Sequence, residues 1–343
     1  MSRRALPLNP ENINGFRTAL LHWYGQHRRD LPWRRDRDPY RVWVSEIMLQ
    51  QTRVAAVLDH YARFLKKFPT VESLAAAREA SVLAIWSGLG YYHRARRMHQ
   101  AAKVIVRQRG GLFPGTAEEW AELPGIGRYT AAAIASIAFG EAVAVVDGNV
   151  TRVVERLLGE PAAKEAIWIQ AQALLDSQRA GDFNQAMMEL GATVCTPRAP
   201  QCLLCPVHAF CQSRGAEAAR PQPPRKQKVL GYGLVQKNST ILLVQRSSNA
   251  SLMAGMWELP GILPGSVNGN APLARLRHSI TDTDYQVVVF EVSPDELPAG
   301  EADRRWLTRR QWEQLPLTGL TRKILRRLGL ESNPNVAESN CHR

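Results

Sequence analysis

The sequence predicts two parts, a mainly α-helical N-terminal region and an α+β C-terminal domain. From Ile13 to about Leu190, apolar residues recur at three- and four-residue spacing, as in 56–64 and 150–158, which is typical of helices that bury one face. A basic, proline-rich stretch at 214–228 cannot continue a helix and predicts a linker. The predicted boundaries are 1–213 for the helical domain, 214–228 for the linker, 229–330 for the C-terminal domain and 331–343 for a flexible tail.

The C-terminal domain is predicted from strand-like runs that follow the linker. VLGYGLV from Val229 and ILLVQR from Ile241 are separated by a short polar turn, 237–239, as the strands of a hairpin would be. YQVVVFEV from Tyr285 predicts a third strand, and 317–330 reads as a closing helix. About a hundred residues of this kind suit one small α+β domain.

The composition favours a polyanionic partner. Lys and Arg total 44 against 31 Asp and Glu, a net charge of +13 that suits nucleic acid or an anionic membrane surface. The longest apolar run, 130–140, is shorter than the roughly 18 residues of a membrane span. The first residues lack the apolar core of a secretory signal. We therefore expect a soluble, cytoplasmic protein.

Four of the five cysteines lie close together and predict a metal centre. Their pattern is C-x6-C-x2-C-x5-C, formed by Cys195, Cys202, Cys205 and Cys211. In a reducing compartment this density indicates metal ligands rather than disulfides. The spacing alone leaves zinc and an iron–sulfur cluster equally open. The fifth, Cys341, falls in the polar tail and is expected to be an incidental thiol.

A glycine-containing segment, LPGIGRYTAAAIASIAF at 123–139, predicts a phosphate-binding turn. Gly125 and Gly127 allow tight backbone geometry ahead of an alanine-rich helix, so their N–H groups and the helix N-terminus can face a phosphate. An ordinary turn between two helices is the alternative. The leading Leu-Pro and the trailing helix make the segment similar to the hairpin of the helix-hairpin-helix DNA glycosylases.

Several further motifs extend this resemblance over residues 13–211. They are RDLPWR from Arg29, SEIMLQQTRV from Ser45, GLGYYHRARR from Gly88 and NQAMMELGATVC from Asn184. Together with the hairpin and the cysteine spacing, they resemble the MutY family of adenine DNA glycosylases. The resemblance implies base excision repair by a bacterial, DNA-associated monomer that carries a [4Fe-4S] cluster on its four cysteines. It also implies a double-stranded DNA substrate, in which adenine opposite 8-oxoguanine or guanine is flipped out and its N-glycosidic bond hydrolysed.

The resemblance assigns two carboxylates to catalysis. Glu46 lies among apolar neighbours, where burial would raise its pKa and keep it a proton donor, here to adenine N7. Asp147 would stay ionised and stabilise the oxocarbenium-like transition state. Its position before an amphipathic helix also suits a purely structural helix cap. Asn149 is expected to orient Asp147 or the attacking water.

Position 129 distinguishes two reaction types within the superfamily. Members that also cut the DNA strand have a lysine there, which forms a Schiff base, whereas this chain has Tyr129. Tyrosine cannot form an imine, so we expect a monofunctional enzyme in which Tyr129 supports the reacting sugar by hydrogen bonding. A catalytically silent DNA-binding scaffold is a further alternative, against which the intact pair Glu46 and Asp147 argues.

The same resemblance implies which residues bind the DNA. The pocket for the extruded adenine would consist of Leu31, Trp33, Arg34 and Glu189. The residues expected to fill the gap and contact the partner base are Gln51, Thr52, Leu89 and Tyr91. Such side chains partly restore the stacking that extrusion removes.

The C-terminal domain resembles the Nudix-like domain of the same family, with MWELPG from Met256 as its marker. It lacks the acidic helix that a Nudix hydrolase needs to hold Mg²⁺, so a nucleotide hydrolase is not expected. The usual Phe-Ser-His of the recognition turn aligns with Ile280, Thr281 and Asp282. Thr281 keeps a hydroxyl for DNA contact, but Ile280 cannot stack as an aromatic ring. We therefore expect weaker discrimination between 8-oxoguanine and guanine than in members with the usual turn.

Overall fold

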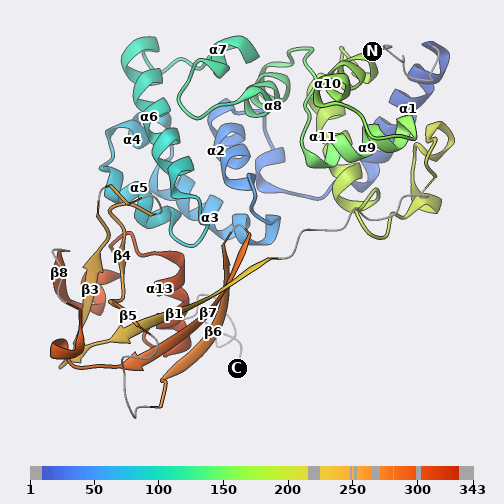
Figure 1. The fold of residues 1–343 in the computed structure, drawn as a ribbon. Coiled ribbons are helices and arrows are strands. Elements are labelled where there is room, and N and C mark those ends of the chain that lie inside the picture. The colour runs from blue at the N-terminus through green and yellow to red at the C-terminus, as the bar shows by residue number, and fades with distance from the viewer. Residues whose placement is uncertain are drawn as a thin grey trace, which may run out of the picture. The chain divides into compact units, whose positions relative to one another are not determined.

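The computed structural model describes residues 10–214, 225–247, 249–250, 253–263, 271–280, 282–298 and 303–331. Within these residues, the N-terminal part is helical, and the C-terminal part combines β-sheets with helices (Figure 1). This arrangement confirms the predicted fold class. No helix in the described ranges combines the length and the apolar character that crossing a membrane requires.

The helical part consists of a series of helices, as predicted. The segments predicted from their spacing, 56–64 and 150–158, lie within two of these helices, α3 and α9. The α-helices are α1 (Pro10–His27), α2 (Pro39–Leu49), α3 (Val54–Lys67), α4 (Val71–Ala76), α5 (Glu79–Trp86), α6 (Tyr92–Arg109), α7 (Ala117–Ala121), α8 (Arg128–Phe139), α9 (Gly148–Leu158), α10 (Lys164–Leu174) and α11 (Ala180–Thr193). Short 3-10 helices are η1 (Pro32–Arg34), η2 (Cys202–Leu204) and η3 (His208–Phe210).

The chain divides into two compact units whose limits differ from the predicted linker alone. We call the first, within Met1–Ala75 and Gln100–Pro221, the helical unit. The second, within Ala76–His99 and Gln222–Arg343, is the C-terminal unit, and it includes α5 and the start of α6. Sequence periodicity groups α5 with the other helices, because periodicity reports a helix and not the core that the helix joins.

Two sheets and three helical elements build the rest of the C-terminal unit, within the described residues. One sheet has the strand order β5-β1-β7-β6, and in the other β3 pairs with β2, β4 and β8. The strands are β1 (Lys226–Leu234), β2 (Gln236–Lys237), β3 (Thr240–Gln245), β4 (Trp257–Glu258), β5 (Gly261–Ile262), β6 (Ala274–Ile280), β7 (Thr283–Glu291) and β8 (Arg304–Thr308). The helical elements are η4 (Pro294–Glu296), α12 (Arg309–Trp312) and α13 (Gly319–Arg327). Leu320, Ile324 and Leu325 of α13 share one apolar core with both sheets.

The structure confirms the predicted strand at 285, the closing helix and the hairpin turn after Lys237, which joins β2 to β3. The first strand of that hairpin, however, does not pair with β3 as predicted. β1 pairs in parallel with β7 along its whole length, and β3 lies in the other sheet. Only the two residues of β2 fold back onto β3. β1 therefore lies in the sheet of its long ladder with valine-rich β7, and such a distant pairing cannot be inferred from the turn residues.

Candidate active site

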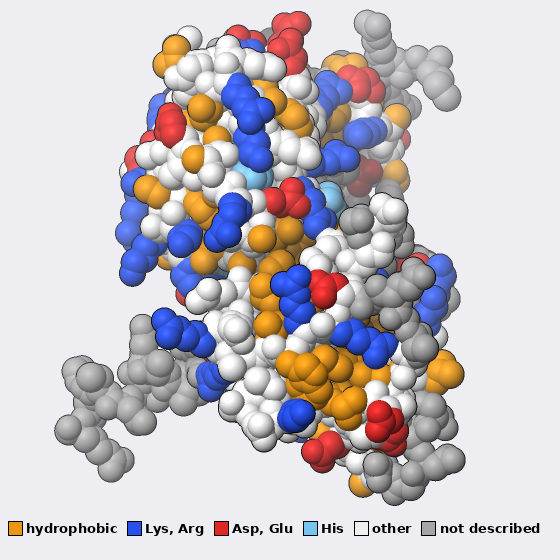
Figure 2. Space-filling view, turned by 90° about the vertical axis from the view of Figure 1, so that its left-hand side faces the viewer, with side chains coloured by type: hydrophobic (Ala, Val, Ile, Leu, Met, Phe, Trp, Pro, Cys, Tyr) orange, Lys and Arg blue, Asp and Glu red, His pale blue; other side chains and the backbone are white. Residues whose placement is uncertain are grey.

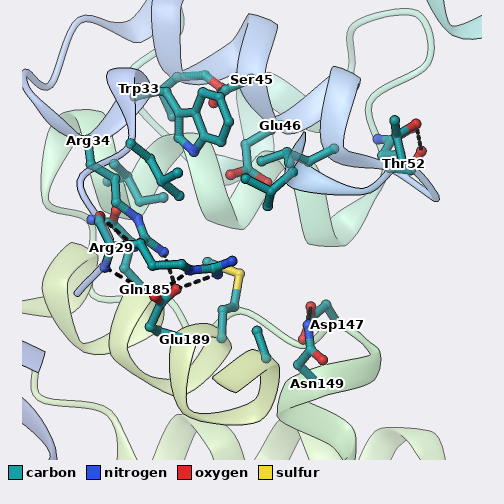
Figure 3. A pocket seen from close by; sticks show the side chains of 18 of the residues that line it. Arg29, Trp33, Arg34, Ser45, Glu46, Thr52, Asp147, Asn149, Gln185 and Glu189 are labelled. Carbon is teal, nitrogen blue, oxygen red and sulfur yellow. Dashed lines mark hydrogen bonds and ion pairs between the residues drawn. The ribbon is translucent and has the colours of Figure 1, made fainter. Parts of the chain in front are cut away.

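A cavity of about 550 Å³ lies in the helical unit and brings both predicted carboxylates together. Glu46 lines the cavity from α2, and Asp147, the residue that directly precedes α9, lines it as well (Figure 3). The other predicted site residues that line it are Leu31, Trp33, Arg34, Gln51, Thr52, Tyr129, Asn149 and Glu189. Side chains from distant parts of the sequence therefore surround one space large enough for a small ligand group.

Glu46 is a buried acid with a raised pKa. Its side chain lies on α2, and its Oε2 accepts a hydrogen bond of 2.8 Å from the Tyr129 hydroxyl. Burial raises the pKa of Glu46 to about 7, against the Tyr129 hydrogen bond, and the nearby charge of Asp147 adds to the rise. A carboxyl group of this kind keeps its proton at neutral pH far more often than an exposed glutamate does.

Two side-chain hydrogen bonds join α2 to α8 on the wall of the cavity. Besides the bond from Tyr129 to Glu46, Gln50 Nε2 donates to Thr130 Oγ1 at 3.0 Å. The Tyr129 hydroxyl also lies 3.4 Å from Met188 Sδ. In this structure the Tyr129 hydroxyl thus donates to Glu46, the predicted acid. That Tyr129 also supports the reacting sugar stays a prediction.

Asp147 is less buried than Glu46 and more extensively hydrogen-bonded. It caps α9, accepting 2.7 Å from the Val150 N–H, and its Oδ2 accepts 2.9 Å from Asn149 Nδ2. Burial raises the pKa of Asp147, while these two hydrogen bonds and Arg152 oppose the rise. The Asp147 carboxylate thus accepts hydrogen bonds from two donors, whereas the Glu46 carboxyl group accepts one from Tyr129, so the two acids lie in different environments.

Helix α11 fixes the chain around Asp147. Buried Asn184 accepts 3.1 Å from the Val145 N–H and donates 2.8 Å to the Val143 carbonyl. At Gly191 the same helix approaches α9 so closely that an added Cβ would lie 2.6 Å from Asn149 Cβ. Arg152 also donates to Asn149 Oδ1 at 2.8 Å. Asn149, which donates to Asp147, is thus in contact with Gly191 of α11 and with Arg152 of α9.

Glu189, near the C-terminal end of α11, is an ionised carboxylate. Arg29 Nε donates to its Oε1 at 2.7 Å, and Arg34 donates to its Oε2 at 2.8 Å (Figure 3). Burial would raise the pKa of Glu189, but the hydrogen bonds from the two arginines outweigh it and lower the pKa to about 2. Trp33 and Leu31 are buried beside this cluster on the cavity wall. The site therefore combines apolar side chains with a carboxylate, Glu189, that is ionised at neutral pH and accepts hydrogen bonds.

The predicted hairpin has the expected form. Helix α7 is followed by a turn in which Gly125 has φ of 81°, and Gly127 caps the start of α8. An added Cβ at Gly127 would meet nothing within 4 Å, so the backbone there is open. The geometry leaves the N-terminal end of a twelve-residue helix accessible to an anion.

Comparisons with known proteins point to one family. Residues 44–174 match the HhH-GPD family, described as "HhH-GPD superfamily base excision DNA repair protein". The human adenine DNA glycosylase is 42% identical, over 73% of this chain and 58% of its own length. The mouse adenine DNA glycosylase is 38% identical, over 88% of this chain and 75% of its own length. The chain belongs to the adenine DNA glycosylase family.

The fold of this chain is similar to that of a solved DNA glycosylase structure. The structure of a thermostable thymine-DNA glycosylase is 30% identical and superposes with a TM-score of 0.56. It covers 60% of this chain and 98% of its own. The chain spans less than two thirds of the human relative, and three quarters of the mouse one.

The residues predicted in this family to contact the partner base lie in both units. Gln51, with φ of 54°, and Thr52 follow α2 in the helical unit. Leu89 and Tyr91 lie between α5 and α6 in the C-terminal unit. Leu89 is only 6% exposed, so it would have to leave its core to reach DNA, whereas Tyr91 is half-buried.

The recognition turn of the C-terminal unit is only partly described. Ile280, the first residue of the predicted recognition turn, ends β6 and pairs with Thr283 of β7. Thr281 lies outside the described residues. Asp282 is exposed and forms an ion pair of 3.1 Å with Lys226, so part of its negative charge is compensated.

Three of the four clustered cysteines, Cys195, Cys205 and Cys211, pack against the core of the helical unit. All four thiols are half-buried. Buried Arg156 of α9 donates to Cys195 Sγ at 3.2 Å and to the Thr196 carbonyl at 2.9 Å, and Cys211 Sγ donates to the Arg156 carbonyl at 3.3 Å. Across the described ranges, no three His, Cys, Asp or Glu side chains form a group that could hold one metal ion.

Three residues important to the site escaped the sequence prediction. Arg29 pairs with Glu189, Asn184 fixes the chain before Asp147, and Gly191 lets α11 approach Asn149. Arg29 and Asn184 each begin a motif used for the family resemblance, which was the only available signal. Their partners lie too far away in sequence to be inferred from spacing.

Proposed function

We propose that this protein is a monofunctional adenine DNA glycosylase, which removes adenine opposite 8-oxoguanine or guanine as the first step of base excision repair. The observation that carries the proposal is the pair Glu46 and Asp147, two carboxyl groups with different hydrogen-bond partners on the wall of one cavity. The names of the family's relatives support the choice of base. The protein would act as a monomer on double-stranded DNA.

In the proposed reaction, the adenine nucleoside leaves the helix and enters the cavity. Glu46 gives its proton to N7 of the base as the C1′–N9 bond breaks, so that the bonding electrons leave with a neutral adenine. Asp147 stabilises the positive charge that develops on the sugar. Water then adds to C1′ and its proton passes to the Glu46 carboxylate, which restores the acid and leaves an abasic site and an intact strand.

The adenine would be recognised by the Glu189 cluster. The exocyclic amine of adenine is a donor, and the Glu189 carboxylate, kept ionised by Arg29 and Arg34, is an acceptor. Leu31 and Trp33 would pack against the flat ring. Guanine has a carbonyl acceptor at the corresponding position, which would face the anionic carboxylate unfavourably.

We infer that the four cysteines hold a [4Fe-4S] cluster. Buried Arg156 supplies positive charge beside the thiols, as a set of thiolates requires. The spacing of the four cysteines suits either zinc or an iron–sulfur cluster, and the choice of a [4Fe-4S] cluster rests on the family resemblance. When bound, the cluster would hold the loop at the end of α9 without entering the hydrolysis.

DNA binding is proposed to rest on the hairpin and on the basic surface. The open backbone at Gly127 and the N-terminus of α8 suit a phosphate. Lys and Arg side chains are spread over the face drawn in Figure 2, in keeping with the net charge of +13. Such charges attract any duplex, and sequence-independent binding of this kind weakens steeply with salt.

The test is a single-turnover glycosylase assay on duplexes that carry each mispair, with alkali to cleave abasic sites. We expect cleavage of the adenine strand only, only after alkali, and no covalent adduct with borohydride because Tyr129 cannot form an imine. Cleavage without alkali, or efficient trapping, would contradict the monofunctional assignment. Loss of another base instead of adenine would contradict the substrate.

The same assay tests the preference for the partner base. We expect adenine opposite 8-oxoguanine to be removed faster than adenine opposite guanine, but with a smaller ratio than for a family member that has Phe-Ser-His in the recognition turn. The reason is Ile280, which offers no aromatic ring for stacking. Replacing Ile280 with phenylalanine should raise the ratio. An equal or larger ratio in the unmodified protein would refute the expectation.

The excision rate should depend on pH through Glu46. A pKa of about 7 means that the donor is mostly protonated below neutral pH and loses its proton above it. We therefore expect a rate that falls about tenfold per pH unit well above pH 7. At acid pH, protonation of Asp147 should reduce the rate again and give a bell-shaped profile. A rate that is constant from pH 7 to 9 would argue against Glu46 as the acid.

Replacing Gly191 with alanine should reduce excision through Asn149. The new methyl group would collide with Asn149 Cβ and with its carbonyl, at 2.6 and 2.9 Å. We expect a loss of about 1–3 kcal/mol of stability and about a tenfold slower single turnover. Gly25→Ala is the matched control, since that helix position has nothing within 4 Å and should gain stability. Unchanged excision in Gly191→Ala would show that Asn149 needs no such support.

A further inference from the structure

The loop between α5 and α6, residues Gly88–Tyr91, holds one residue, Tyr91, in a conformation that non-glycine residues rarely adopt. Gly88 and Gly90 have φ of 109° and 71°, and Tyr91, which is not a glycine, has φ of 46°. A left-handed conformation at a tyrosine persists only where the surroundings hold it. The contacts that hold this loop are therefore of functional interest, because Tyr91 is the proposed DNA-contacting residue.

Inside the loop, the backbone is fixed by two side chains. Trp86 Nε1 donates to the Gly90 carbonyl at 3.1 Å, and Arg94 Nη2 donates to the carbonyls of Leu89 and Gly90 at 3.2 and 3.3 Å. The Arg94 guanidinium also lies 5.4 Å from the ring centroids of both Trp86 and Tyr91. These contacts give the loop a shape but do not attach it to anything outside 86–94.

The attachment is made at the two residues that flank the loop. Ser87 Oγ donates to the Leu317 carbonyl at 2.7 Å, and the Tyr92 hydroxyl lies 3.1 Å from the same oxygen. Arg322 Nε of α13 donates to Ser87 Oγ at 2.6 Å. Ser87, Tyr92 and Leu317 are all buried, so water cannot replace these bonds easily.

The acceptor at Leu317 is itself rigid. The Trp257 N–H of β4 donates to the Pro316 carbonyl, and the Thr318 N–H donates to the Trp257 carbonyl, each at 2.9 Å. Thr318 then caps α13, accepting from the Thr321 N–H. The Leu317 carbonyl thus sits between a strand and the start of a helix, and its direction is fixed by both.

We propose that Ser87, Tyr92 and Arg322 are positioning residues that tie both ends of the Gly88–Tyr91 loop to Leu317, and so set how Tyr91 meets the base opposite the extruded adenine. The proposal rests on the proposed function for the DNA contact of Tyr91. It assigns the C-terminal unit a second task beside the recognition turn at 280–282. We call Ser87, Tyr92, Arg322 and the Leu317 carbonyl the clamp. It joins residues 317–322 to a loop from the N-terminal half of the sequence.

The test uses Ser87→Ala and Tyr92→Phe, each of which removes one hydroxyl and leaves Leu317 one donor, and the double variant, which removes both. Tyr40→Phe is the matched control, because Tyr40 is a buried tyrosine whose hydroxyl donates to the Phe68 carbonyl at 2.8 Å in the helical unit. We expect both single variants to excise adenine within about threefold of the unmodified protein and the double variant about tenfold more slowly. Tyr40→Phe should excise at the unmodified rate.

A double-mutant cycle with Tyr91→Ala separates positioning from general damage. Loss of one stacking contact should slow excision about tenfold. If the clamp acts through Tyr91, then Ser87→Ala/Tyr92→Phe/Tyr91→Ala should be no slower than Tyr91→Ala alone. Effects that multiply, or a double variant within twofold of the unmodified protein, would overturn the proposal.

Fluorescence gives a readout besides excision. A 2-aminopurine placed beside the partner base reports stacking, and in the Glu46→Gln background the adenine stays in place. We expect the clamp variants to shift this signal toward that of Tyr91→Ala, while Tyr40→Phe leaves it unchanged. If the double variant unfolds, Ser87→Ala carries the test, because it also removes the acceptor of Arg322 and should shift the signal by a smaller amount in the same direction. A signal equal to that of Tyr40→Phe overturns the proposal. If the unmodified protein fails to excise adenine, the proposed function is wrong, whereas the clamp is still judged by fluorescence.

Discussion

Replacing Glu46 with glutamine is expected to slow adenine excision by about 10³-fold at neutral pH, equivalent to ~4 kcal/mol of transition-state stabilisation. Glutamine keeps the size of the side chain and can still accept the hydrogen bond from Tyr129. It cannot give a proton to the departing base. Because burial raises the pKa of Glu46 to about 7, the loss should be largest where the normal acid is still protonated. Single-turnover rates measure the effect.

The control separates chemistry from binding. Glu313→Gln makes the same change at an exposed residue that pairs with Arg309, and its rate should equal that of the unmodified protein. Duplex affinity, measured by fluorescence anisotropy at fixed salt, should differ by no more than a few-fold between the two variants. Excision by Glu46→Gln within tenfold of normal would remove Glu46 from the role of general acid.

Replacing Asp147 with asparagine is expected to cost a similar factor, about 10³-fold in single-turnover rate, through loss of negative charge near the reacting sugar. Asparagine is as good a helix cap as aspartate, so α9 should still begin at the same residue. Burial raises the pKa of Asp147, which means that folding disfavours its ionised form. At pH 7, above its usual range, the neutral amide should therefore leave the melting temperature unchanged or raise it.

A second helix cap supplies the comparison. Asp38 caps α2, accepts 2.9 Å from the Arg41 N–H, and does not line the cavity. Asp38→Asn should leave both excision and melting temperature close to normal. If Asp147→Asn behaves in the same way, then Asp147 is a structural cap and the catalytic assignment fails.

The sequence predicts the parts of the site that depend on local context. Apolar neighbours of Glu46 predicted its burial, and Gly148 with the following amphipathic run predicted Asp147 as a cap; both features are present. The cysteine spacing likewise predicted a cluster of thiols on one loop. Each of these signals comes from residues within one or two helical turns of the group concerned.

Features that depend on distant partners could not be predicted. The pairing of Arg29 with Glu189 joins residues 160 positions apart, and nothing near either residue specifies the other. The same reason explains why the strand at 229 does not pair with β3 as predicted, since β1 pairs with β7 rather than with its neighbour in sequence. Membership of α5 in the C-terminal unit is a third case, because it depends on which core buries the helix.

The position of the unit boundary inside α6 matters for how deletion experiments are interpreted. A chain cut in the linker would keep Ser87 and Tyr92 but lose Leu317 and Arg322, so it would lack the support of the Gly88–Tyr91 loop as well as the turn at 280–282. Any change in partner-base preference after such a cut therefore has two sources. Point substitutions at each one, in the intact chain, are needed to divide the effect between them.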